Sequence, residues 1–410
     1  MSSVASTTGS VDLPVGVYGW AGAGFGSLVG AFARFVGGRA GSGGAVAVYR
    51  HGEPLVDIWT GSAAPSRPWT ADTGALVFSA TKGIASTVVH RLADRGLIDY
   101  DTPVAAYWPA FAAAGKSRIT VRDILTHRAG LSALPPGAAA ELLDHLLLEQ
   151  RLAAAKPGRL QGVPAYHALT FGWLVAGLAR AVTGCGMAEL FRTEVAEPLG
   201  IDGIHLGRPA AGSTTTIAAL SGSRFAAAGS AAGGLMLGRV HGVPGPIGSM
   251  AGALYVRGVH ALFDGDDPPV LDTEMPAANG VCTARALAVV YAVLAGDGTA
   301  YLSGRTLREL RRIQTFQPDR TLGYAPMLWR LGYHSVPVPG GYAGFGHIGV
   351  GGCFGWAEPR LGLSVGFVHN RLSMGRGTAD QLASGWVLPL AIRGARAARA
   401  RARLAAPHAA

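Results

Sequence analysis

The pair of residues best suited to chemistry in this sequence is Ser79 and Lys82, which stand three positions apart. At the start of a helix this spacing places both side chains on one face, so the lysine amine reaches the serine hydroxyl. Ser79 then becomes a nucleophile with an activating base beside it. Free N–H groups and the positive dipole end at a helix N-terminus also favour the negative charge that develops during attack.

The residues that follow predict the helix that this chemistry needs. Ile84, Val88 and Leu92 recur every four residues, as on the buried face of a helix, and Gly96 supplies a left-handed stop. A serine and a lysine at this spacing also occur by chance in most chains of this length. The interpretation therefore depends on the rest of the sequence.

Four segments together give the chain a resemblance to a known superfamily. They are a strand-turn-strand pattern at 45–59, the Ser79–Lys82 helix, the run Ile119-Thr120-Val121-Arg122-Asp123-Ile124-Leu125-Thr126-His127-Arg128-Ala129-Gly130-Leu131 with its Thr-x-x-Asp capping pattern, and the later motifs Tyr166-His167-Ala168 and His347-Ile348-Gly349. With these motifs, residues 26–395 resemble the serine β-lactamases and penicillin-binding proteins, in particular the class C β-lactamases and family VIII esterases.

The resemblance implies an α+β fold of the β-lactamase/transpeptidase type, with an antiparallel sheet flanked by helices and a mostly helical inserted lobe. Strand-like runs near the N-terminus and from Tyr342 to Asn370 agree with a sheet assembled from both ends of the chain. We predict a flexible segment at 1–15, an α/β lobe at 16–110 and 320–392, a helical and loop-rich lobe at 111–319, and a basic tail at 393–410. Residues 205–265 show little periodicity and predict loops.

Tyr166 precedes a helical pattern that ends at Gly184, which places it in a loop. The resemblance implies that Tyr166 and Lys82 move the proton from Ser79 to the leaving group and later from water. We expect a nearby cation to lower the pKa of Tyr166 for that task.

His347 stands where β-lactamases carry the lysine of Lys-Thr-Gly. The resemblance implies that the strand with His347 and Gly349 binds substrate and that the N–H of Val350 joins that of Ser79 in an oxyanion hole. Two departures favour esters. His347 weakens fixed-charge recognition of a carboxylate, and Ala168 replaces an asparagine whose amide would bind a β-lactam or a peptide.

These residues predict a serine hydrolase that cleaves short or medium acyl esters through an acyl-enzyme, without cofactor or metal. Acyl transfer and β-lactam or D-peptide hydrolysis are the alternatives within the same fold. From a different class comes a non-catalytic binding or self-assembling scaffold, which would have no need of Ser79, Lys82 and Tyr166 together. The sequence does not indicate the oligomeric state.

Composition predicts a globular protein with a large core, since 49% of the 410 residues are hydrophobic and only 15% are charged. The net charge of +10 owes half its value to five arginines of the tail, namely Arg393, Arg396, Arg399, Arg401 and Arg403. No nucleic-acid motif accompanies them, so we expect a solvated helix extension and no nucleic-acid partner. No basic residue precedes Arg34, and 13–33 is glycine-rich. We therefore expect a cytoplasmic protein without stable membrane insertion.

Other motifs offer weaker chemistry. Gly362-Leu363-Ser364-Val365-Gly366 matches the nucleophile elbow of α/β-hydrolases, but its flanks predict a strand and no usable histidine follows. The glycine-rich segment 19–30 has no preceding strand and breaks the dinucleotide-binding pattern. The twelve histidines show no zinc spacing, and we expect Cys185, Cys282 and Cys353 to be buried as small hydrophobic residues.

Overall fold

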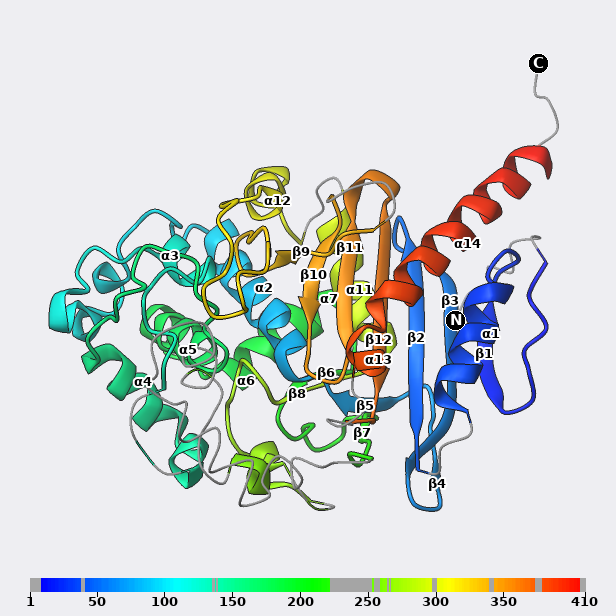
Figure 1. Ribbon diagram of the computed structural model, residues 1–410, viewed down its shortest axis with the longest axis horizontal. Coiled ribbons are helices and arrows are strands. Elements are labelled where there is room, and N and C mark those ends of the chain that lie inside the picture. The colour runs from blue at the N-terminus through cyan, green and yellow to red at the C-terminus, as the bar shows by residue number, and fades with distance from the viewer. Residues whose placement is uncertain are drawn as a thin grey trace.

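A computed structural model describes residues 9–37, 41–134, 137, 139–221, 253, 259–263, 265, 267–296, 301–338, 343–372 and 378–405. A large antiparallel sheet forms its centre, with strands in the order β1-β3-β2-β12-β11-β10-β9 and β4 paired to β3 (Figure 1). These strands are β1 Val17–Ala21, β2 Gly43–Arg50, β3 Glu53–Ala64, β4 Arg67–Pro68, β9 His334–Ser335, β10 Phe345–Ile348, β11 Phe354–Glu358 and β12 Leu363–His369. Both ends of the chain therefore build one sheet, as the sequence predicts.

The hairpin predicted at 45–59 is confirmed as β2 and β3. Its turn residues His51 and Gly52 have φ values of 49° and 83°, so the turn uses left-handed backbone. Residues 342–370 are confirmed as strand-rich where they are described. Ser364 lies inside β12 with its hydroxyl donating to the Ala288 carbonyl at 2.8 Å, so the elbow-like motif is part of a strand.

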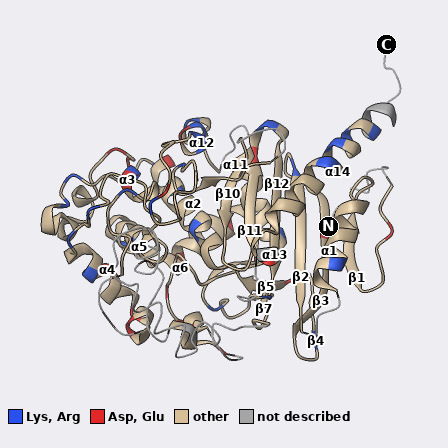
Figure 2. Cartoon of the chain, in the orientation of Figure 1, with Lys and Arg blue, Asp and Glu red and all other residues tan. Residues whose placement is uncertain are grey.

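The alternation of side chains along these strands produces two separate cores. Val46 and Val48 face α1 (Gly26–Val36) and the long α14 (Ser384–Ala405), whereas Ala45 and Ala47 face α11 (Ala284–Ala295). The helices lie on both faces of the sheet, and α14 extends beyond the body at the edge where α1 also lies (Figure 1). Figure 2 shows basic residues along this projecting helix, and Arg393, Arg396, Arg399 and Arg401 are exposed, so the predicted helix extension is confirmed.

The remaining helices form a lobe on the other side of the sheet from α14 (Figure 1). They are α2 Thr81–Asp94, α3 Val121–Leu125, α4 His145–Ala154, α5 Thr170–Thr183, α6 Met187–Leu190, α7 Glu197–Leu199 and α12 Gly304–Arg311. The short helix α13 (Thr378–Gln381) lies instead near α14 (Figure 1). A small sheet has the strand order β6-β8-β5-β7 and comprises β5 Thr73–Leu76, β6 Ile204–Leu206, β7 Thr216–Ile217 and β8 Gly280–Cys282. The fold class is confirmed, while the lobe boundaries at 110, 319 and 392 stay predictions.

Local signals in the sequence account for the helix ends near the site. Thr120 and Asp123 form the predicted capping box at the start of α3, and Gly184 ends α5 with left-handed backbone. Gly96 follows α2 with φ of 75°. In their described part, the predicted loops at 205–265 contain the short strands β6 and β7 and a 3-10 turn at Val259–Leu262, whereas 222–252, 254–258 and 264 lie outside the described residues.

The three cysteines are unpaired. Cys282 and Cys353 are buried as expected, but Cys185 is only half-buried because it follows the exposed end of α5. None of the helices that the structure describes is by itself long and apolar enough to cross a membrane. Only α5 together with residues 187–199 reaches that length and composition, and these two parts are bent by 80°.

Candidate active site

Ser79 lies in a single 3-10 turn, Phe78–Ala80, between β5 and α2. Phe78, directly before Ser79, has φ of 45°, which is a left-handed backbone conformation that residues other than glycine rarely adopt. The Thr81 hydroxyl donates to the Phe78 carbonyl at 2.5 Å and accepts the Gly280 N–H at 2.9 Å. Contacts with β8 therefore hold the turn that presents Ser79, and strain of this kind is typical of functional sites.

Lys82 projects from the first turn of α2 and is completely buried. Its Nζ lies 3.0 Å from Ser79 Oγ and donates to the Ala168 carbonyl at 2.6 Å and the Ala277 carbonyl at 3.0 Å. Burial holds the pKa of Lys82 well below that of a free lysine. The side chain is thus fixed against Ser79 in a form that favours the neutral amine, which is able to accept a proton.

Tyr166 lies in the loop before α5 next to Ser79, whose side chain acts to lower the pKa of the Tyr166 hydroxyl. The Lys82 Nζ lies 5.0 Å from the centre of the Tyr166 ring. Burial, the largest effect, raises the pKa of Tyr166, and the negative charge of Asp319 raises it further. The expectation that a cation lowers this pKa is therefore wrong for the free protein, because loss of solvation is the largest effect and raises it. The low pKa of this pair belongs to Lys82.

Two buried histidines connect the Tyr166 loop to the segment that follows α3. The His127 carbonyl accepts the Ala165 N–H at 3.0 Å, and its Nδ1 accepts the His167 N–H at 3.2 Å. His167 in turn lies 2.6 Å from the Ala165 carbonyl through Nδ1 and accepts the Leu131 N–H through Nε2 at 3.0 Å. Burial lowers the pKa of both imidazoles, to about 4 for His167, so both are neutral connectors at pH 7.

The end of β10 forms the opposite wall of the site. A β-carbon at Gly349 would overlap the Val77 carbonyl and approach the Ala80 N–H, so only glycine allows this strand to lie so close to the Ser79 turn. Val350 follows directly in the chain, and the role of its N–H in an oxyanion hole stays a prediction. The Gly349 N–H itself donates to the Cys353 carbonyl at 2.8 Å.

His347 is almost completely buried on β10. Its Nδ1 lies 3.3 Å from the Ile348 carbonyl, and its Nε2 has no hydrogen-bond partner in the described part of the chain. Burial, His334 and Lys82 hold the pKa of His347 well below its usual value. A neutral imidazole therefore occupies the place where β-lactamases carry a lysine cation.

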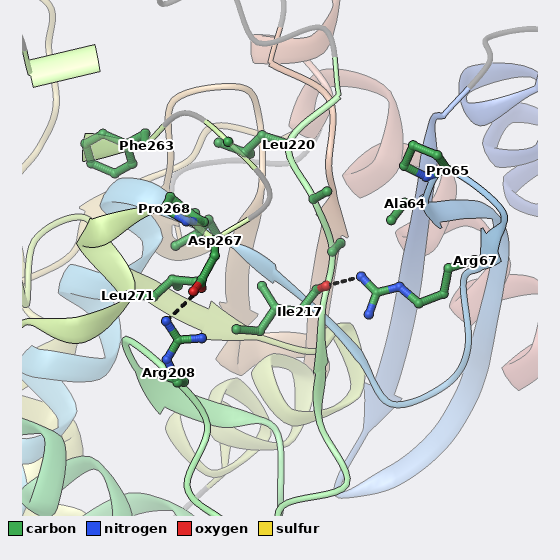
Figure 3. Close-up of a pocket in the computed structure, with 14 residues that line it drawn as sticks. Ala64, Pro65, Arg67, Arg208, Ile217, Leu220, Phe263, Asp267, Pro268 and Leu271 are labelled. Carbon is green, nitrogen blue, oxygen red and sulfur yellow. Dashed lines mark hydrogen bonds and ion pairs between the residues drawn. The ribbon is translucent and has the colours of Figure 1, made fainter. Parts of the chain in front are cut away.

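A pocket of about 450 Å³ has Leu76, at the end of β5, among its lining residues (Figure 3). The lining combines apolar side chains, such as Ile217, Leu220 and Leu271, with the charged Arg67, Arg208 and Asp267. Phe263 also lines the pocket, and its ring centre lies 5.6 Å from that of Phe78 in the Ser79 turn. Within the ranges that the structure describes, no three His, Cys, Asp or Glu side chains are arranged to hold a metal ion.

The geometry brings Ser79, Lys82 and Tyr166 together, with His347 on β10 and Gly349 and Val350 directly after that strand. In the comparison with known proteins, the family described as Beta-lactamase matches residues 28–384. The chain belongs to the beta-lactamase family. The resemblance seen in the sequence is thereby confirmed over nearly its whole length.

Several relatives of this family member are known. The chain is 50% identical over 363 residues to the esterase/beta-lactamase LipL of Mycobacterium tuberculosis, which covers 87% of this chain and 83% of that protein. A family VIII carboxylesterase of known structure is 32% identical, with a TM-score of 0.74 over 94% of this chain and 99% of that one. A penicillin-binding protein homologue from Caulobacter crescentus is 27% identical, with a TM-score of 0.76 over 93% and 99% of the two chains.

Sequence reasoning missed several groups of this beta-lactamase family site. The carbonyls of Ala168 and Ala277, which hold the lysine, carry no side-chain signal. His127 is visible in the Thr-His-Arg-Ala-Gly-Leu run, but its bonds to the Tyr166 loop are not. Asp319 and Trp329 lie far from the motifs in sequence, and no pattern singles them out.

Proposed function

We propose that this protein is a serine carboxylesterase that cleaves short or medium acyl esters through a covalent acyl-enzyme on Ser79. The observation that carries the proposal is the buried Lys82 amine, 3.0 Å from Ser79 Oγ, with its pKa held low by burial. A desolvated lysine of this kind is a base for a serine nucleophile at neutral pH.

In the first half of the reaction, Ser79 Oγ forms a bond to the ester carbonyl carbon while its proton passes to the Lys82 and Tyr166 pair. The N–H groups of Ser79 and Val350 stabilise the negative oxygen of the tetrahedral intermediate. As the carbon–oxygen bond of the ester breaks, the pair returns the proton to the departing alkoxide. Water then attacks the acyl-enzyme, its proton follows the same route, and the carboxylic acid leaves with Ser79 restored.

The identities of His347 and Ala168 support esters as the substrate class. The neutral His347 offers no fixed positive charge for a substrate carboxylate, and Ala168 offers only a methyl group where an amide would orient a β-lactam. The basis for short and medium esters is the pocket of about 450 Å³ whose lining residue Phe263 packs on Phe78, since this volume suits a small acyl chain. The name of the LipL relative joins esterase to beta-lactamase, so β-lactam hydrolysis is the alternative to be measured.

Intact-mass analysis after treatment with a fluorophosphonate tests the proposal most directly. We expect one phosphonyl group per chain on the wild type, located at Ser79 by peptide mapping, and none on Ser79→Ala. A chain that takes up no label while hydrolysing no p-nitrophenyl ester would support a non-catalytic scaffold. Label on another serine would remove Ser79 from the mechanism.

A further inference from the structure

Asp319 is a fully buried carboxylate next to the Tyr166 loop. Its Oδ1 accepts the N–H groups of Tyr166 at 3.2 Å, Thr321 at 2.9 Å and Leu322 at 2.9 Å. Its Oδ2 accepts the indole N–H of Trp329 at 3.0 Å. None of these four donors carries a formal charge, so N–H dipoles alone stabilise the carboxylate. Burying a carboxylate without a charged partner costs free energy. A buried group of this kind therefore points to a specific task.

Two of the four donors converge on Tyr166. One is the backbone N–H of Tyr166 itself. The other belongs to Trp329, whose buried ring stacks on the Tyr166 ring with the two planes only 8° apart and 5.7 Å between their centres. The Asp319 carboxylate therefore holds Tyr166 in two ways. It accepts the Tyr166 backbone N–H, and it accepts the indole N–H of Trp329, which stacks on the face of the Tyr166 ring.

We propose that Asp319 is a positioning residue that aligns the Tyr166 hydroxyl with Ser79, acting through the Tyr166 N–H and the Trp329 indole. The inference rests on the proposed function, in which Tyr166 shares the proton of Ser79. Alignment matters because a displacement of about 1 Å at a reacting group costs on the order of 10²-fold in rate.

Asp319 also acts on the charge of the site. Among the described residues, the titratable side chains that face or surround Tyr166 are Lys82 on α2, His127 after α3, its neighbour His167, His334 on β9, His347 on β10, and Asp319. Asp319 is the only acid in this group. Its negative charge raises the pKa of Tyr166 and so opposes loss of a proton from the Lys82 and Tyr166 pair.

Two substitutions separate alignment from charge. Asp319→Asn keeps one oxygen for the three backbone donors but turns an amide NH₂ toward the indole N–H, so that hydrogen bond is lost together with the charge. Trp329→Phe keeps an aromatic ring against Tyr166 and the charge of Asp319, and removes the indole donor together with one ring of the indole. Both variants are measured with p-nitrophenyl butyrate across pH.

We expect both variants to lose about 10- to 100-fold in kcat, with KM changed less than about twofold, because alignment affects the reaction more than substrate binding. The acidic limb of the pH profile moves to lower pH in Asp319→Asn alone, since only that variant removes the charge. Asp94→Asn is the matched control, as Asp94 accepts bonds from Ser303 and Thr306 at the far end of α2. It is expected to change stability without changing kcat.

Wild-type kcat in both variants would overturn the proposal. So would an equal loss in Asp94→Asn, because the effect would then follow stability alone. If Asp319→Asn does not fold, Trp329→Phe decides by the split between kcat and KM. Tyr166→Phe separates the proposed function from the positioning role. Full activity of Tyr166→Phe would refute the proton relay. Loss of activity in Tyr166→Phe, together with full activity of Asp319→Asn, would refute only the positioning role of Asp319.

Discussion

The amine of Lys82 lies 3.0 Å from the hydroxyl of Ser79, and the other two contacts of that amine are backbone carbonyls. No carboxylate takes part in this set. Since carbonyl oxygens are weaker partners for an ammonium ion than a carboxylate, burial is not offset, and the neutral amine is favoured. The fold thus holds Lys82 as a neutral amine that can accept a proton, in place of the solvated ammonium ion of a free lysine.

Ser79→Ala should abolish hydrolysis of p-nitrophenyl butyrate, with a loss on the order of 10⁴-fold or more, because the variant has no nucleophile. Circular dichroism should remain that of the wild type. Ser364→Ala is the matched control, since Ser364 is the serine of the elbow-like motif and is buried in β12. It should keep its activity and lose only about 1 kcal/mol of stability with its hydrogen bond to Ala288. A tenth of wild-type activity in Ser79→Ala would exclude Ser79 as the nucleophile.

Lys82→Ala and Tyr166→Phe should each lower kcat/KM by at least about 10²-fold, because both groups handle the Ser79 proton. The double variant should lose much less than the product of the single losses, as is typical of residues that act as a unit. Steady-state kinetics of the three variants provide the measurement. Fully multiplicative losses would show that the two side chains do not share a proton path.

The sequence predicts the elements of this site better than it predicts their contacts. The period of Ile84, Val88 and Leu92 defines α2, and the Thr120 capping box defines α3, because these signals are local. The carboxylate of Asp319 reaches Tyr166 across 153 positions, and such a contact depends on how distant loops pack. The direction in which the pKa of Tyr166 is shifted could likewise not be predicted from the sequence, since burial is the largest effect on it.

Lys82→Met should change how stability depends on pH. In the wild type the folded state holds Lys82 at a pKa well below the usual 10.5, so the unfolded chain binds more protons between the lowered pKa and about 10.5. Wild-type stability therefore gains about 1.4 kcal/mol per pH unit from this residue as pH rises through that window. Lys82→Met lacks the gain. Urea unfolding at pH 7 and pH 10 should show the wild type improving relative to the variant, and parallel behaviour would contradict the buried neutral amine.

Acid should destabilise the protein through its buried histidines. Burial lowers the pKa of His90, His167, His334 and His369 to about 4 from the usual 6.5. Between these values the unfolded chain binds more protons than the folded one, so stability is lost as pH falls from about 6.5 toward 4. Each histidine contributes about 1.4 kcal/mol per pH unit within that window. Urea midpoints that stay constant from pH 7 to pH 5 would show that these imidazoles are not buried in neutral form.

The choice between ester and β-lactam substrates depends on the two positions where this chain departs from the β-lactamase pattern. His347 is buried and neutral, so it cannot hold a substrate carboxylate by charge, and the Ala168 methyl is almost completely buried beside Tyr166 and Trp329. A β-lactam would then lack the polar contacts that orient its amide, while an ester with a good leaving group needs fewer of them. We therefore expect kcat/KM for p-nitrophenyl esters of two to eight carbons to exceed that for a chromogenic cephalosporin by at least about a thousandfold, the scale on which lost substrate hydrogen bonds discriminate. Comparable values for the two substrates would replace the esterase assignment with that of a β-lactamase.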